Sequence, residues 1–121
     1  MHKGILDAEI VQGLVDLEKD GSPGLIAELL ELLQSSAPEA FDAIAAGIGR
    51  SDAPMVSSAA HSLKSSFANL GAKELSRVCM EIEQGARRGD LSSAAERLAE
   101  LRAGFPAVEE ALRDLTKSLS E

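Results

Sequence analysis

The sequence has few of the residues that bind nucleic acids. It contains no tryptophan or tyrosine and only three phenylalanines among its 121 residues. Lysine and arginine together number 12, against 20 aspartates and glutamates, and the formal net charge is -8. Nucleic-acid surfaces use aromatic rings to stack on bases and cations to neutralise phosphates. This composition argues against a nucleic-acid partner and favours a protein partner.

Cysteine and long apolar runs are also scarce. Cys79 is the only cysteine, so an internal disulfide is impossible and a thiolate zinc site lacks its ligands. The glycines follow no P-loop spacing, so we expect no nucleotide site and no cofactor. No apolar run reaches the roughly 18 residues of a membrane span, and the N-terminus shows no signal-peptide pattern. We therefore expect a cytoplasmic protein that does not contact membranes.

What the chain does contain is a helical pattern throughout. Its length predicts one domain over residues 1–121, with residues 1–4 as a disordered end. Apolar residues spaced three and four apart predict a short helix after Asp7 and four longer helices. We expect the longer helices to begin at Ser22–Pro23, at Ser51 or Asp52, after Gly71, and at Asp90.

The fold class follows from these helices and the short linkers between them. Strand-like alternation is absent, and short linkers favour antiparallel neighbours. We predict an all-α fold, an up-and-down antiparallel four-helix bundle with an additional short N-terminal helix. Pro38 is expected to bend or split the second helix, and Pro106 to kink or break the last one.

One histidine in the third predicted helix faces the wrong way for the core. At about 100° per residue, His61 lies about 160° from the direction of Leu63, which marks the apolar stripe. Lys64 is three residues on, within reach of the same spot. The other neighbours on this outer face are all small, which leaves the ring accessible to a partner: Ser57, Ser58, Ser65 and Ala68.

The residues around His61 resemble a known family signature. In histidine-containing phosphotransfer domains of bacterial and fungal phosphorelays, the histidine is followed by x-Leu-Lys-Gly, two small residues, and later an apolar residue and glycine. Here the stretch from His61 reads HSLKSSFANLGA. The downstream residues Leu75, Val78, Cys79, Ile82 and Glu83 are similar to the family's next helix. One departure is Ser65, which stands where the family usually has glycine.

This resemblance implies a stoichiometric phosphoryl carrier and not an enzyme. His61 would accept a phosphoryl group from an aspartyl phosphate on one receiver domain and pass it to another, while Lys64 and Ser65 stabilise it. Any Mg²⁺ would belong to the receiver, and the carrier itself would hold no metal and act as a monomer. Gly71 would be structural. The docking surface would consist of small residues and cations, namely Ser57, Ser58, Ala68, Lys73, Arg77 and Arg87.

Two alternatives stay open at this point. One is a phosphotransfer domain excised from a hybrid sensor kinase, which a continuing reading frame would reveal. The other is a non-phosphorylated helical adaptor in which His61 is incidental. The adaptor hypothesis predicts partner binding that is insensitive to His61→Gln.

Lys64→Ala tests the placement of the lysine. Transfer to His61 should slow because a positive charge near the phosphoryl group is lost, while the fold persists because Lys64 lies off the apolar stripe. Transfer rates and circular dichroism measure the two effects. A large loss of helicity would contradict this placement.

Overall fold

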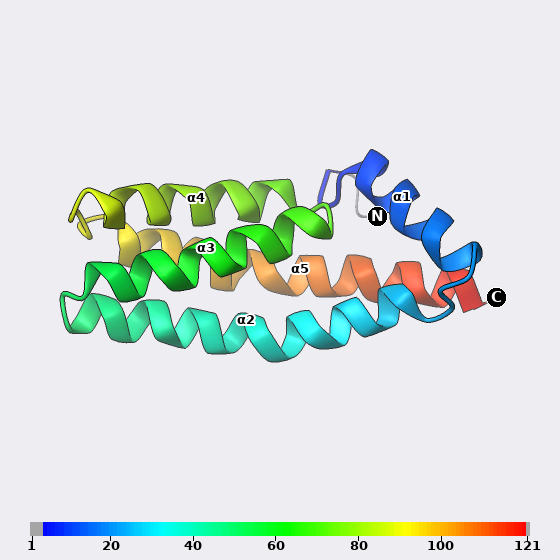
Figure 1. The fold of residues 1–121 in the computed structure, drawn as a ribbon, viewed down its shortest axis with the longest axis horizontal. Helices are drawn as coiled ribbons and strands as arrows, with labels where there is room; N and C mark the ends of the chain where they lie inside the picture. Colours follow the sequence, from blue (N-terminus) through cyan, green and yellow to red (C-terminus); the bar gives the residue numbers. More distant parts are fainter. Residues whose placement is uncertain (1–3, 121) are drawn as a thin grey trace.

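The structure, a computed structural model, describes residues 4–120, and helices joined by short turns make up all of its regular secondary structure over that range. Its five helices are shown in Figure 1: α1 (Ala8–Lys19), α2 (Leu25–Gly49), α3 (Ala53–Asn69), α4 (Lys73–Arg87) and α5 (Ala94–Ser120). The predicted fold class, an all-α bundle with a short helix in front, is confirmed. The predicted loose end at residues 1–4 lies outside the described residues except for Gly4, which is exposed in a turn.

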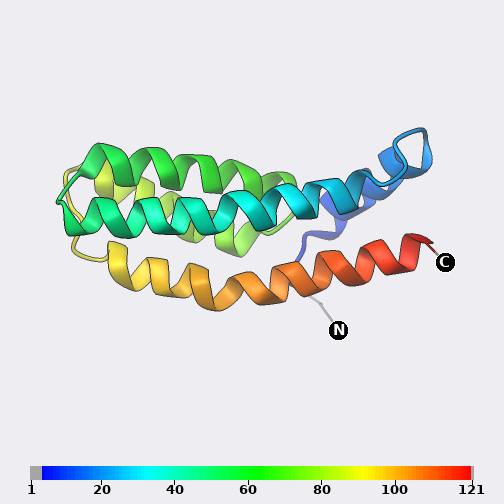
Figure 2. The same ribbon diagram turned by 90° about the horizontal axis from the view of Figure 1, so that it is seen from below.

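Helices α2 to α5 lie side by side as an antiparallel bundle (Figures 1 and 2). Each of α3 and α5 packs against both α2 and α4. The amino-terminal part of α2 and the carboxyl-terminal part of α5 extend beyond α3 and α4, and α1 lies at this end of the bundle (Figure 2). There α1 packs against α2. The compact four-helix part is therefore the part that contains His61.

The three phenylalanines meet inside the bundle. Phe105 of α5 packs edge-on against Phe41 of α2 and Phe67 of α3, with ring centroids 5.5 and 6.2 Å away. All three are buried. Edge-to-face contacts of this kind add to the stability that comes from burying apolar area. The few aromatic residues of this chain thus tie three of the four bundle helices together.

Two predicted helix starts are wrong. Helix α2 begins at Leu25 and not at Ser22–Pro23, because Gly24 precedes it in a left-handed conformation and the Glu18 carboxylate of α1 accepts from the Ile26 N–H at 2.9 Å. A side chain from the preceding helix replaces the local serine cap. Asp90 does not cap α5 either; its carboxylate accepts from Ser92, and α5 begins at Ala94.

Two other helix starts have side-chain caps, and both prolines lie inside helices. Asp7 caps α1 through a hydrogen bond from Ile10, as predicted. Of the two candidates for α3, Asp52 is the cap, and it accepts from Met55. Helix α2 continues through Pro38 and α5 through Pro106, so the predicted split and the predicted break are excluded. Both prolines are exposed, so neither ring is packed into the core.

Helices α2 and α3 approach closely at Gly47. A Cβ atom there would lie 2.7 Å from Val56 Cγ2, 3.2 Å from the Val56 nitrogen and 3.3 Å from the Asp52 oxygen. Two of these neighbours are backbone atoms, which cannot rotate away. The short turn between α2 and α3 therefore depends on a residue without a side chain at position 47.

Gly47→Ala is expected to destabilise the bundle by about 1–3 kcal/mol, the usual cost of overpacking a core. The matched control is Gly49→Ala in the same helix, where a Cβ meets nothing within 4 Å. That control should be neutral or should stabilise by up to about 1 kcal/mol through helix propensity. Urea unfolding measures both. Equal effects of the two substitutions would contradict the close approach.

Candidate functional site

Helix α3 presents His61 on its outer face. Of the predicted apolar stripe, Ala59 is half-buried, and the other members are buried: Val56, Ala60, Leu63, Phe67 and Leu70. The His61 side chain is 55% exposed. The helical period thus separates a core-forming face from a face that carries an accessible imidazole.

Glu83 of α4 forms a hydrogen bond with this imidazole ring. Its carboxylate Oε2 lies 2.8 Å from His61 Nδ1. The Glu83 side chain is only 2% exposed, which makes it the one charged residue among the buried residues of the described chain. A buried carboxylate is costly unless partners compensate it.

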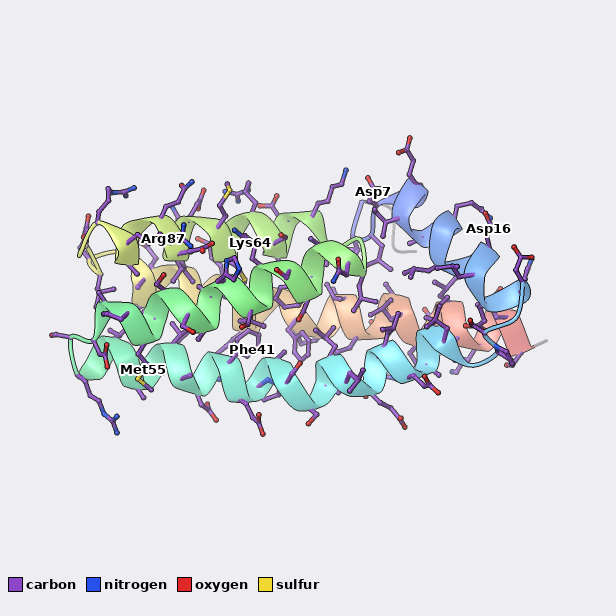
Figure 3. The ribbon with its side chains drawn as sticks, in the orientation of Figure 1. Asp7, Asp16, Phe41, Met55, Lys64 and Arg87 are labelled. Atoms are coloured by element: carbon purple, nitrogen blue, oxygen red, sulfur yellow. The ribbon has the colours of Figure 1, made fainter. Side chains whose placement is uncertain are left out.

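Two cations supply that compensation. Lys64 Nζ lies 2.7 Å from Glu83 Oε1, and Arg87 Nη2 lies 2.6 Å from Oε2. In Figure 3, Lys64 and Arg87 lie on the same face, where α3 and α4 run side by side. Ser76 of α4 donates to the Lys64 carbonyl at 3.0 Å and joins the two helices at this level. We call His61, Lys64, Glu83 and Arg87 the histidine cluster.

The histidine cluster determines which ring nitrogen of His61 carries the proton. Burial by itself would raise the pKa of the Glu83 carboxyl. The hydrogen bonds from Lys64 and His61, with the charges of Lys64 and Arg87, outweigh burial and hold this pKa below its ordinary value of 4.5. Glu83 is therefore ionised at neutral pH and can only accept hydrogen bonds. The proton of a neutral His61 ring then lies on Nδ1, and Nε2 carries the lone pair.

The small residues predicted around His61 lie where the helical period puts them. Ser58, Ser65 and Ala68 are exposed, and Ser57 is half-buried. These four α3 residues therefore leave the outer face of His61 open. Gly71 follows the end of α3 with a φ of +83°, and its carbonyl accepts from the Asp7 N–H at 2.7 Å.

The three cations predicted for docking have different surroundings. Arg87 belongs to the histidine cluster. Lys73 pairs with the Asp7 carboxylate at 2.9 Å, at the junction with α1. Arg77 pairs with Glu74 and Glu81 on its own helix. Of the three, the structure brings only Arg87 into contact with the residues that hold His61.

A shallow groove between α2 and α3 borders the same region. Its α3 side includes Ser58 and Ser62, which flank His61 in the sequence. Its α2 side consists mostly of small residues, and the Ser36 end continues into a second hollow beside Leu32, an apolar side chain that is 65% exposed. The groove lining is Ser36, Glu39, Ala40, Ala43, Met55, Ser58, Ala59 and Ser62.

The role of Glu83 was missed by reasoning from the sequence, which used it only as part of a motif. A signal was present. Glu83 lies four residues after Cys79 and one after Ile82, on the stripe that buries α4. A carboxylate on an apolar stripe needs a partner, and the outward histidine and lysine of the preceding helix were candidates. The groove on α2 had no comparable signal.

Residues 4–120 include no group of three or more histidine, cysteine, aspartate or glutamate residues arranged to hold a metal ion. None of the helices described combines the length and apolarity that crossing a membrane requires.

Comparison with known proteins identifies the class to which this fold and site belong. Residues 28–116 match the family model of the Hpt domain, and the chain belongs to this family. It is thus a phosphotransfer domain of phosphorelays, a class that carries phosphoryl groups and interacts with receiver domains. A search of curated proteins found no significant match.

Two solved structures share the fold over almost the whole chain. One is the histidine-containing phosphotransfer protein B (HptB) from Pseudomonas aeruginosa PAO1, with 24% identity and a TM-score of 0.83, covering 96% of this chain and 97% of that one. The other is the histidine-containing phosphotransfer protein ZmHP2 from maize, with 26% identity and a TM-score of 0.84, covering 98% and 90%.

The lowered pKa of Glu83 predicts a specific acid sensitivity. Because the folded-state pKa lies below the ordinary value of 4.5, the ionised carboxylate stabilises the fold fully above that value. The stabilisation is lost as the pH falls through the folded-state pKa. The stability advantage of wild type over Glu83→Gln should therefore shrink as the pH falls below 4.5.

Urea unfolding at several pH values measures this difference. Glu110→Gln, at an exposed position of α5, is the matched control and should follow wild type throughout. A Glu83→Gln variant with the same pH dependence as wild type would contradict the assigned ionisation.

Proposed function

We propose that the protein accepts a phosphoryl group on Nε2 of His61 from the aspartyl phosphate of one receiver domain and passes it to a second receiver domain. The observation that supports this most directly is the hydrogen bond from His61 Nδ1 to Glu83. It gives an exposed imidazole a defined orientation and leaves Nε2 as the nucleophile.

The transfer needs no proton acceptor in this chain. The Nε2 lone pair forms a bond to phosphorus while the bond between phosphorus and the aspartate oxygen breaks, and the receiver carboxylate leaves with that electron pair. Nδ1 keeps its proton, so the ring becomes positively charged. The Glu83 carboxylate 2.8 Å away stabilises this charge. The return step to a second receiver reverses these changes.

Two residues on α3 are available to the phosphoryl oxygens. Lys64, one turn from His61 and 31% exposed, supplies a positive charge. Ser65 is exposed one turn beyond His61, and its hydroxyl can donate a hydrogen bond that the glycine usual at this position in the family cannot. Mg²⁺ and the acidic pocket that organise in-line transfer belong to the receiver.

The groove between α2 and α3 supports a docking surface next to His61. Its small lining residues allow a partner backbone to approach closely, and the exposed Leu32 at its far end offers an apolar contact. A receiver that lies along this groove would bring its phosphorylated aspartate over α3. The docking surface we propose therefore includes α2 residues such as Ala40 and Ala43 beside the predicted Ser57, Ser58 and Ala68.

Transfer of labelled phosphate from a phosphorylated receiver tests the function. Wild-type protein should acquire a phosphate that is labile in acid and stable in base. His61→Gln should acquire none, a loss of at least about a thousandfold, because the nucleophile is gone. His2→Gln, which removes the only other histidine of the chain, is the control and should behave as wild type.

Phosphate on His61→Gln, or none on wild type from any receiver of the source organism, would refute the proposal. A partner that binds wild type and His61→Gln equally, with no phosphate transferred to either, would favour the adaptor function.

A further inference from the structure

The histidine cluster holds one more cation than Glu83 needs. Both Lys64 and Arg87 pair with this single carboxylate, Lys64 at Oε1 and Arg87 at Oε2. With a neutral His61, the cluster carries one excess positive charge. A second cation on one buried carboxylate requires an explanation beyond neutralising it.

Phosphorylation of His61 would place a second anion within reach of Lys64. A dianionic phosphoryl group on Nε2 competes with Glu83 for the lysine, which lies three residues from His61 on the same helix. Glu83 is 2% exposed, so it cannot exchange a departing lysine for full hydration. If Lys64 were its only cation, each transfer would leave an uncompensated charge inside the protein.

Arg87 is placed to prevent this. It lies four residues after Glu83 on α4, one helical turn away, and its guanidinium contacts Oε2, the oxygen that also accepts from His61. The arginine can therefore hold the carboxylate and keep Oε2 in place for Nδ1 without contacting Oε1. Its own side chain is 64% exposed, so the charge itself remains well hydrated.

We propose that Arg87 is a positioning residue for phosphotransfer: it neutralises and holds Glu83, and thereby frees Lys64 to move to the phosphoryl group on His61. This inference rests on the proposed function of His61. After transfer the ring is positive and the phosphoryl group is a dianion, so the cluster with both cations becomes neutral. The excess charge before transfer thus matches the charge that arrives.

This role differs from the docking role that the sequence suggested for Arg87. A docking residue would contact the receiver and would matter only when the donor is a protein. A residue that acts through Glu83 would matter for any phosphoryl donor, and only while position 83 carries a negative charge. Measurements with a protein donor and a small-molecule donor, with and without the charge at position 83, therefore distinguish the docking role of Arg87 from a role through Glu83.

The experiment measures phosphorylation of His61 by a phosphorylated receiver and by phosphoramidate, a small donor whose P–N bond breaks with release of ammonia. Arg87→Ala is made in the wild-type and Glu83→Gln backgrounds. Arg88→Ala, which removes the exposed arginine next in sequence, is the matched control. Thermal unfolding by circular dichroism is recorded for every variant, and rates are measured below the lowest melting temperature.

Arg87→Ala should slow phosphorylation about tenfold with both donors, the loss expected for one charge-assisted hydrogen bond. In the Glu83→Gln background, the same substitution should have little effect, because a neutral amide needs no cation. Arg87→Lys should recover most of the rate, which loss of packing alone would not explain. Arg88→Ala should match wild type with phosphoramidate.

Three results would overturn the inference: a loss confined to the receiver donor, an equal loss in the Glu83→Gln background, or no loss at all. The proposed function fails separately. If phosphoramidate phosphorylates His61 but no receiver does, the proposal of receiver-to-receiver transfer is wrong. The rates measured with phosphoramidate still test the role of Arg87 in that case. If Arg87→Ala does not fold, Arg87→Gln is compared with Arg87→Lys in the same assay.

Discussion

A buried carboxylate organises the functional surface of this protein. Glu83 is taken out of water by α4, and the fold tolerates it only because three side chains converge on it from α3 and α4. The same contacts orient His61, hold Lys64 one turn away and fix the proton on Nδ1. The requirement to satisfy one charge in the interior thus produces an oriented imidazole at the surface.

The apolar core that carries this arrangement is built without His61. The core is formed by apolar stripes and by contacts among three phenylalanines, and His61 contributes nothing to it. Helices α3 and α4 pack extensively against each other and are joined by the hydrogen bond from Ser76 to the Lys64 carbonyl. His61 and the carboxylate that orients it therefore lie on two helices that pack directly against each other.

Much of the fold follows from local patterns in the sequence. The apolar period that buries Leu63 and exposes His61 is a property of one helix, as are the caps at Asp7 and Asp52. Two of the failures involve contacts between helices. The cap of α2 comes from Glu18, a residue of the preceding helix, and the interior side of the histidine cluster comes from Glu83, 22 residues after His61.

The same limit applies to the charged residues. Arg87, Lys73 and Arg77 look alike in the sequence, because each is a cation on the outer part of α4. Only their partners distinguish them. Arg87 pairs with the buried carboxylate of Glu83. Lys73 pairs with Asp7, which caps α1, and Arg77 pairs with two carboxylates of its own helix. The family resemblance located the histidine and its lysine, while the counter-charge that orients them required the packing of two helices.

The central claim is that the bond between His61 Nδ1 and Glu83 leaves Nε2 as the phosphoryl acceptor. Nitrogen-15 and phosphorus-31 NMR of the phosphorylated protein test it most directly, because they distinguish the two ring nitrogens. We predict a phosphoryl group on Nε2 and a proton retained on Nδ1, with the Nδ1 resonance shifted in Glu83→Gln. A phosphoryl group on Nδ1, or an Nδ1 proton indifferent to Glu83→Gln, would contradict the account.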